Sequence, residues 1–312
     1  MQNENILLRE EAAALRLRAL YAEGGYRQYK MSKFEEYDLY ANNKDFLESD
    51  RIITFTDVSG KLMALKPDVT LSIVRHTDFM PGRTEKLYYN ETVYRVPKGA
   101  PGFREMPQVG LECIGDTGGE DVAGVIGLAL GSLEVLADEY VLDLSHFGLV
   151  SAVLEETGLT GKAAKAALGC LHEKNAHGLQ ALCEENGVPA EAAEKLQALV
   201  RCYGAPETAL PALKETFGAY PACAELENLC DSLTEAQKKA VRIDFSVQGN
   251  LKYYNGIVFK GYVKGLPAYV LSGGQYDGLL KRMKKPGRAL GFAVYLDSLR
   301  LLPREEECAW KC

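Results

Sequence analysis

The order of apolar and polar residues predicts both helices and strands along the chain. Apolar residues recur at helical spacing over residues 5–23 and 120–137, and Gly24-Gly25 ends the first of these helices. Two later segments, residues 271–283 and 291–302, each predict a strand that runs into a helix. Short apolar or alternating runs bounded by turn residues predict further strands at residues 52–56, 62–65, 141–145, 241–246 and 251–263.

Residues 85–115 predict a long antiparallel hairpin. Two strand-like runs flank a loop that is rich in residues that break regular structure. Those residues are Pro97, Gly99, Pro101, Gly102 and Pro107. The rest of the chain can be arranged around this hairpin.

The two arms of the hairpin carry polar residues that suit a ligand. In an extended second arm, Gln108, Gly110 and Glu112 share one face, and Gly110 leaves a flat gap between an amide and a carboxylate. Arg95 ends the first arm and Arg104 lies in the loop. A zwitterion fits this set, because the anionic group binds an ammonium and the guanidiniums bind a carboxylate or phosphate. An ordinary solvated strand face fits the same residues, and both interpretations stay open.

Two other segments also allow a structural and a functional interpretation. Pro67, Asp68 and Thr70 resemble the start of a helix, where Asp68 is either a cap or a pocket residue. Gly273-Gly274 at a predicted strand end permits close approach of a ligand to the backbone, but is also common in structural turns. The run around it lacks the spacing of a phosphate-binding loop.

Residues 147–239 differ in composition from the rest of the chain. They are dense in Ala, Leu, Glu and Lys, and glycine and proline interrupt them at intervals. This pattern predicts a helical module inserted between strands of the main sheet. We therefore expect a core domain formed by residues 1–146 and 240–312, and a helical insertion at residues 147–239.

Composition and charge exclude several classes of protein. The 312 residues are 47% hydrophobic, which is enough to bury a large core, and the net charge is -7. An acidic chain disfavours broad nucleic-acid binding, which depends on clustered Lys and Arg. No apolar run is long enough to span a bilayer, and the first residues lack a signal core, so we expect a cytoplasmic protein.

Cysteine and histidine give no sign of metal or redox chemistry. None of the eight cysteines forms a CxxC pair, and the four histidines make no cluster with metal-ligand spacing. The sequence therefore predicts free thiols, and neither a metal site nor a cofactor.

Six motifs occur in the order found in one family. They are KPDVT followed by VRH, VYR, FREMPQVGLECIG, LKYYNGIVF, SGGQYDG and GFAVYLDSL. In this order they resemble the catalytic core of histidyl-tRNA synthetases, and resemble still more the synthetase-like regulatory subunits of ATP phosphoribosyltransferase. The resemblance covers nearly the whole chain.

The resemblance implies a fold and a ligand. The fold is the α+β class II aminoacyl-tRNA synthetase fold, an antiparallel sheet flanked by helices, normally dimeric. The implied ligand is histidine, whose amine would meet Asp68 and Gln108 and whose imidazole would meet Glu112 and a tyrosine hydroxyl. The implied pocket residues are Asp68, Thr70, Arg95, Arg104, Gln108, Glu112, Tyr253 and Tyr254.

Departures from the synthetase pattern argue against aminoacylation. Gly249 and Ser298 stand where synthetases carry arginines that assist adenylate formation and bind ATP. Phosphoryl charge needs such groups for stabilisation. We also expect no anticodon-binding domain. The resemblance thus implies a regulatory subunit without catalytic activity of its own. Such a subunit is required for activity and histidine feedback control of short-form ATP phosphoribosyltransferase, the first enzyme of histidine biosynthesis.

Two alternatives remain at this point. A truncated synthetase-like ligase could still activate an amino acid through Arg95, Arg104 and Glu112. A free-standing amino-acid sensor that binds some other protein would retain the pocket without the catalytic partner.

Overall fold

The computed structural model describes residues 6–47, 51–78, 80, 82–96, 101–247 and 253–302. The chain divides into two compact units. Unit 1 consists of Met1–Tyr140, Tyr262–Gly273 and Asp277–Cys312, and unit 2 consists of Val141–Gly261 and Gly274–Tyr276. Pro97 and Gly99 of the hairpin loop, and Gly249 of the altered motif, lie outside the described residues.

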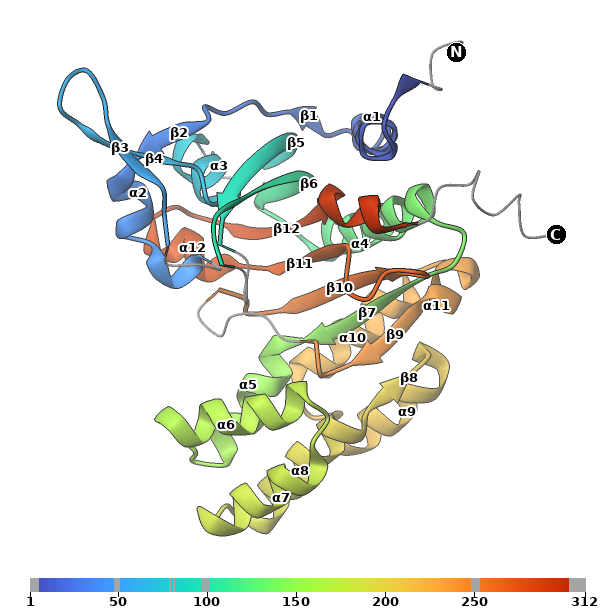
Figure 1. Ribbon diagram of the computed structural model, residues 1–312. Helices are drawn as coiled ribbons and strands as arrows, with labels where there is room; N and C mark the ends of the chain where they lie inside the picture. Colours follow the sequence, from blue (N-terminus) through green and yellow to red (C-terminus); the bar gives the residue numbers. More distant parts are fainter. Residues whose placement is uncertain are drawn as a thin grey trace. The chain divides into compact units, whose positions relative to one another are not determined.

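Unit 1 contains the hairpin and the segments around it (Figure 1). Its helices are α1 (Arg9–Glu23), α2 (Tyr37–Ala41), α3 (Thr70–His76), α4 (Gly119–Leu136), α12 (Asp277–Arg282) and the 3-10 helices η2 (Lys44–Phe46) and η3 (Leu296–Leu301). Its strands are β1 (Arg27–Gln28), β2 (Phe34–Glu36), β3 (Thr54–Thr56), β4 (Leu62–Leu65), β5 (Thr84–Arg95), β6 (Arg104–Gly115), β12 (Arg288–Tyr295) and most of β11 (Leu271–Gln275).

The predicted hairpin is the centre of the unit 1 sheet. β5 and β6 pair antiparallel over their whole length, from Thr84 opposite Gly115 to Arg95 opposite Arg104. β12 pairs antiparallel with the other edge of β6, and the strands follow the order β1-β5-β6-β12-β11. The fold class is as expected, but β1 pairs with β5 in parallel. A parallel pair requires a long connection, which residues 29–83 supply here.

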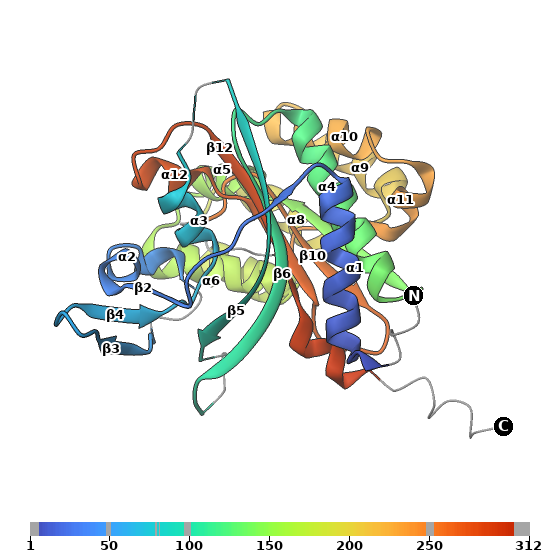
Figure 2. The ribbon, with the colours of Figure 1, turned by 90° about the horizontal axis from the view of Figure 1, so that it is seen from above.

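Helices cover one face of this sheet, and a second small sheet lies toward the other (Figure 2). α1 and α4 lie on one side of β5 and β6, while α3 lies with β2, β3 and β4 on the opposite side. The three short strands form a separate antiparallel sheet of order β2-β4-β3.

Tyr21 of α1 anchors the helix side of the sheet. Its ring contacts Tyr88 at 6.3 Å and Phe292 at 5.7 Å between centroids, and its hydroxyl hydrogen-bonds Ser132 of α4 over 2.9 Å. Tyr89 and Gly291, which are adjacent in sequence to Tyr88 and Phe292, therefore face the α3 side, because side chains alternate across a strand.

Unit 2 carries the helices of residues 147–239 together with four strands. The helices are α5 (Phe147–Glu156), α6 (Gly161–His172), α7 (Ala176–Glu185), α8 (Ala190–Arg201), α9 (Pro206–Phe217), α10 (Pro221–Asp231) and α11 (Glu235–Ala240). The strands are β7 (Tyr140–His146), β8 (Tyr203–Gly204), β9 (Val241–Asp244) and β10 (Ile257–Val263), in the order β10-β7-β9-β8. β7 and β9 are a second parallel pair, connected through the helices.

Three predicted elements differ from the structure. Arg104 and Pro107, which the sequence predicted in the hairpin loop, lie in β6, where they pair with Arg95 and Thr92. Residues 251 and 252 of the strand predicted for residues 251–263 lie outside the described residues. From Tyr253 on, the strand begins at Ile257, because the Ile257 N–H bonds the Gln275 side chain and Tyr254 packs against Phe147 and Val258. The glycines Gly273 and Gly274 lie inside β11 and do not end it.

Candidate functional site

The candidate site is built on the face of β6 that lies toward α3. Gln108, Gly110 and Glu112 share this face, as the alternation predicted. Glu112 is 2% exposed and Gln108 is 3% exposed, so neither is part of a solvated surface. Burial of an amide and a carboxylate on one strand requires polar partners, because an unpaired buried charge is strongly unfavourable.

Glycine and threonine hold the Glu112 carboxylate in place. Glu112 lies opposite Gly291 of β12, and a Cβ at position 291 would lie 1.8 Å from Glu112 Oε2. The carboxylate therefore lies over the strand, in space that any other residue would fill. On its other side, Thr70 Oγ1 donates a hydrogen bond to Glu112 Oε1 over 2.5 Å.

Tyr89 fills the gap that the sequence predicted at Gly110. The two residues lie opposite each other on β5 and β6, and a Cβ at position 110 would lie 2.4 Å from the Tyr89 hydroxyl oxygen. The expectation of an open flat gap was therefore wrong, because the glycine makes room for a tyrosine of the neighbouring strand. A glycine in a strand opposite an aromatic residue is the sequence signal that could have predicted Tyr89.

Asp68 is both a helix cap and a neighbour of the site. Its Oδ1 accepts a hydrogen bond from Leu71 N over 2.8 Å at the start of α3. Burial raises the pKa of Tyr89 well above its ordinary value, the Glu112 and Asp68 carboxylates raise it further, and Arg95 opposes them. The Tyr89 hydroxyl therefore stays protonated among two acids and a guanidinium.

The two arginines of the hairpin differ in solvent exposure. Arg95 and Arg104 are direct partners in the ladder at the loop end of the hairpin. Arg95 is 6% exposed, whereas Arg104 is exposed. Arg95 can contribute a fixed positive charge to the site, and Arg104 lies at its rim.

Two buried polar atoms near the site have no hydrogen-bond partner among the described residues. They are Nε2 of Gln108 and the hydroxyl of Tyr40 on α2. Burial raises the pKa of Tyr40, and Asp68 and Glu35 raise it further. Buried polar atoms in native proteins are nearly always satisfied by protein, water or ligand, so this region suits a polar ligand.

An ion pair lies beside Gln108 that the sequence analysis missed. Lys66 Nζ contacts Glu91 Oε2 over 2.5 Å, and Glu91 lies opposite Gln108 in the ladder. Lys66 is 1% exposed. No motif or spacing in the sequence indicates this pair, because its partners are 25 residues apart and lie on different elements.

Tyr253 and Tyr254 belong to unit 2 and form an aromatic group there. Their ring centroids lie 4.6 Å apart, and Tyr253 also contacts Tyr276 at 5.4 Å. A Cβ at Gly274 would lie 2.7 Å from the Tyr254 ring. The close approach to the Gly273-Gly274 backbone is therefore made by Tyr254, and the pocket role of both tyrosines remains a prediction.

Two further observations concern metal ligands and membrane-spanning helices. Within them, no group of three or more His, Cys, Asp or Glu side chains is placed to hold a metal ion. None of the helices in the described ranges is long and apolar enough to cross a membrane. Ser298, which stands in place of a synthetase arginine, lies half-buried in η3.

Unit 1 thus brings together five of the eight predicted pocket residues around one strand face, with Arg104 at the edge. The set offers carboxylates at one end and a buried guanidinium at the other, with an amide between them, and this is complementary to an amino acid.

Sequence comparison relates the chain to proteins of one family over most of its length. The histidyl-tRNA synthetase family model matches residues 4–299. The chain is 32% identical to the ATP phosphoribosyltransferase regulatory subunit of Moorella thermoacetica, over 96% of this chain and 80% of that protein. It is 33% identical to the protein of the same description from Thermus thermophilus, over 94% of this chain and 79% of that protein.

Solved structures share the fold. A crystal structure of an ATP phosphoribosyltransferase regulatory subunit/histidyl-tRNA synthetase from Bacillus halodurans C superposes with a TM-score of 0.81 at 24% identity, covering 95% of this chain and 79% of that chain. A chain of the ATP phosphoribosyl transferase (HisG:HisZ) complex from Thermotoga maritima superposes with a TM-score of 0.71 at 18% identity, covering 92% of this chain and 97% of that one.

Proposed function

The chain belongs to the histidyl-tRNA synthetase family and, within it, to the ATP phosphoribosyltransferase regulatory subunits, and from this premise we propose that it is the non-catalytic partner of a short ATP phosphoribosyltransferase. It activates that catalytic subunit and makes it sensitive to histidine. The assembly is a cytoplasmic hetero-oligomer in which two copies of this chain pair with each other. The identity of about a third to two named regulatory subunits over almost the whole chain is the observation that carries this proposal.

Histidine is the ligand of the pocket in this proposal. Glu112, fixed by Thr70 over 2.5 Å, receives the imidazole. A role of Tyr253 or Tyr254 in histidine binding stays a prediction of the sequence resemblance. Gln108 and Asp68 receive the amino group, and Arg95 receives the carboxylate. The buried amide nitrogen of Gln108, which lacks a partner among the described residues, is a donor and supports a ligand that also carries a hydrogen-bond acceptor, while the amide oxygen accepts from the amino group.

The chain does not form an aminoacyl adenylate in this proposal. Adenylate formation needs positive groups on the phosphates, and Ser298 stands where synthetases carry an arginine. The second altered position, Gly249, lies outside the described residues. Pyrophosphate exchange with any amino acid is therefore expected to be at background.

Feedback control follows from linkage. Histidine bound to the assembly stabilises the quaternary arrangement for which it has the higher affinity, and this arrangement has low activity. If histidine changes the affinity of this chain for the catalytic subunit by some factor, the catalytic subunit must change the affinity of this chain for histidine by the same factor.

The decisive experiment measures phosphoribosyl-ATP formation by the short catalytic subunit with and without this chain, while histidine is titrated. We expect activity to rise when the chain is added and to fall with histidine. Glu112→Ala and Tyr254→Phe should weaken inhibition and keep activation. Glu191→Ala, which removes an exposed carboxylate of α8, serves as the matched control. No change in rate on addition of the chain would contradict the proposal.

A further inference from the structure

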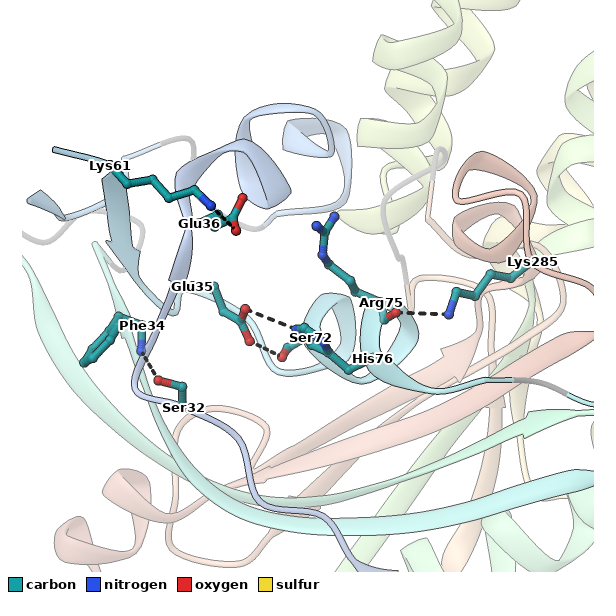
Figure 3. Close-up of polar contacts among 9 residues, drawn as sticks. All are labelled: Ser32, Phe34, Glu35, Glu36, Lys61, Ser72, Arg75, His76 and Lys285. Carbon is teal, nitrogen blue, oxygen red and sulfur yellow. Dashed lines mark hydrogen bonds and ion pairs between the residues drawn. The ribbon is translucent and has the colours of Figure 1, made fainter. Parts of the chain in front are cut away.

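The helix α3 makes polar contacts on two opposite sides. Thr70, at its start, bonds Glu112 in the pocket. Ser72 and His76, one turn apart, face strand β2. Ser72 Oγ donates to Glu35 Oε1 over 2.7 Å, and His76 Nε2 lies 3.2 Å from Glu35 Oε2, so one carboxylate contacts two turns of the helix (Figure 3).

The helix is also held at both ends. Asp68 caps its first turn through Leu71 N. At its last turn, Lys285 Nζ donates to the carbonyl oxygens of Arg75 and Thr77 over 3.0 and 2.5 Å. Residues Thr70, Leu71, Ser72, Ile73 and Val74 are all buried. A helix of 7 residues that is fixed this way moves as one body, so a shift at Thr70 displaces Ser72 as well.

Glu35 connects this helix to an exposed surface. It lies in the middle of β2, opposite Ala64 of β4, with Phe34 before it. The Phe34 side chain is 47% exposed and contacts Phe55 of β3, with ring centroids 5.5 Å apart. A displacement of Glu35 therefore changes the outer surface of the small sheet.

We infer that α3 transmits occupancy of the pocket to the β2-β4-β3 sheet through the Ser72–Glu35–His76 contacts. This inference rests on the proposed function, because it takes histidine as the pocket ligand. A ligand that bonds the Glu112 carboxylate shares it with Thr70 and orders the first turn of α3. The Ser72 and His76 contacts then order Glu35 and β2, so that binding energy reaches a surface the ligand does not contact.

Hydrogen exchange of the isolated chain tests this coupling. Saturating L-histidine should slow amide exchange at three places: around Glu112 in β6, in α3, and in β2 and β4. In Glu35→Gln and His76→Gln, the protection of β6 and α3 should remain, and the protection of β2 and β4 should be lost. The histidine affinity of both variants, measured by calorimetry, should change less than about twofold. His76 is half-exposed, so its replacement does not threaten folding.

Glu36→Gln is the matched control. Glu36 is the next residue of β2, but its carboxylate pairs with Lys61 at the surface, and it interacts with α3 only at longer range, through the charge of Arg75 (Figure 3). This variant should keep the full response of β2 and β4. Protection confined to β6 and α3 in the unaltered chain, or a response of β2 that survives both test variants, would overturn the coupling. Absence of protection at Glu112 as well would overturn the histidine pocket itself, and the coupling with it.

Discussion

Thr70 donates a hydrogen bond of 2.5 Å to the Glu112 carboxylate, and this bond joins α3 to the centre of β6. The two residues are 42 positions apart in the chain. Both are buried, so the interaction is not weakened by water. Glu112 is placed by this bond and by Gly291 before any ligand arrives, which lowers the ordering cost of binding.

Replacing Thr70 by valine tests this placement. Valine keeps the shape and removes the hydroxyl, so a buried carboxylate loses a donor. We expect the free energy of unfolding to fall by about 1.5–3 kcal/mol, the usual range for a hydrogen bond to a charged group, and histidine affinity to fall with it. Urea unfolding and calorimetry measure the two effects. Thr56→Val, at an exposed position of β3, is the control and should change neither.

Gly291→Ala should damage the site without adding or removing charge. The new Cβ would lie 1.8 Å from Glu112 Oε2 and 2.5 Å from the Leu111 carbonyl oxygen. The carboxylate can move away but the strand backbone cannot, so we expect both lower stability and weaker histidine binding. Gly124→Ala is the contrasting variant, because apart from the backbone of its own helix nothing among the described residues lies within 4 Å of a Cβ there. Histidine binding by Gly291→Ala that equals that of the unaltered chain would contradict the assigned position of Glu112.

Local patterns in the sequence predicted the strands and the helix that form the site. They did not predict which side chains of other elements would lie next to them. Alternation of side chains predicts the hairpin and the faces of its strands, and a capping residue predicts the helix after Asp68. Both signals act over a few positions of the chain. The Tyr89 side chain over Gly110 depends on which residues become opposite when the strands pair. Periodicity in one strand gives the face on which a side chain lies, but not which residue of the neighbouring strand lies opposite it.

The parallel strand pairs were missed for the same reason. β7 and β9 read individually as strands, but nothing within either run distinguishes a parallel neighbour from an antiparallel one. The pocket residues came chiefly from the order of six motifs, and only Gln108, Glu112 and the arginines were also indicated by their chemistry. Tyr40 carries no such signal, because a tyrosine on a short helix is ordinary at the surface. Lys66 belongs to the KPDVT motif, but nothing in that motif indicates Glu91 as its partner.

Replacing one residue of the buried pair Lys66–Glu91 should lower the free energy of unfolding more than replacing both. Lys66 is 1% exposed, so Glu91→Gln leaves an ammonium without its counterion inside the protein. We expect a loss of up to about 3–5 kcal/mol in the free energy of unfolding, and recovery of part of it in the double variant Lys66→Met, Glu91→Gln. Denaturant unfolding of the single and double variants gives the coupling free energy. Additive losses would show that the two side chains do not interact.

The stability of unit 2 should depend on pH through Asp143. Burial, and to a lesser degree the Asp244 carboxylate, raise the pKa of this carboxyl from 3.8 to about 6, against the opposing charges of Lys174, Arg242 and Lys260. Between about pH 4 and pH 6 the folded chain therefore binds a proton more tightly than the unfolded chain, so this group lowers stability as pH rises.

Asp143→Asn removes the titratable carboxyl group and isolates its effect on stability. We expect the variant to have a higher Tm than the unaltered chain at about pH 7.5, where Asp143 is charged in the folded protein, and the difference to shrink toward about pH 4.5, where it is largely protonated. Asp231→Asn, at an exposed position of α10, is the control for general charge effects and should show no such trend. A Tm difference between Asp143→Asn and the unaltered chain that stays constant across this range would show that Asp143 does not titrate with a raised pKa.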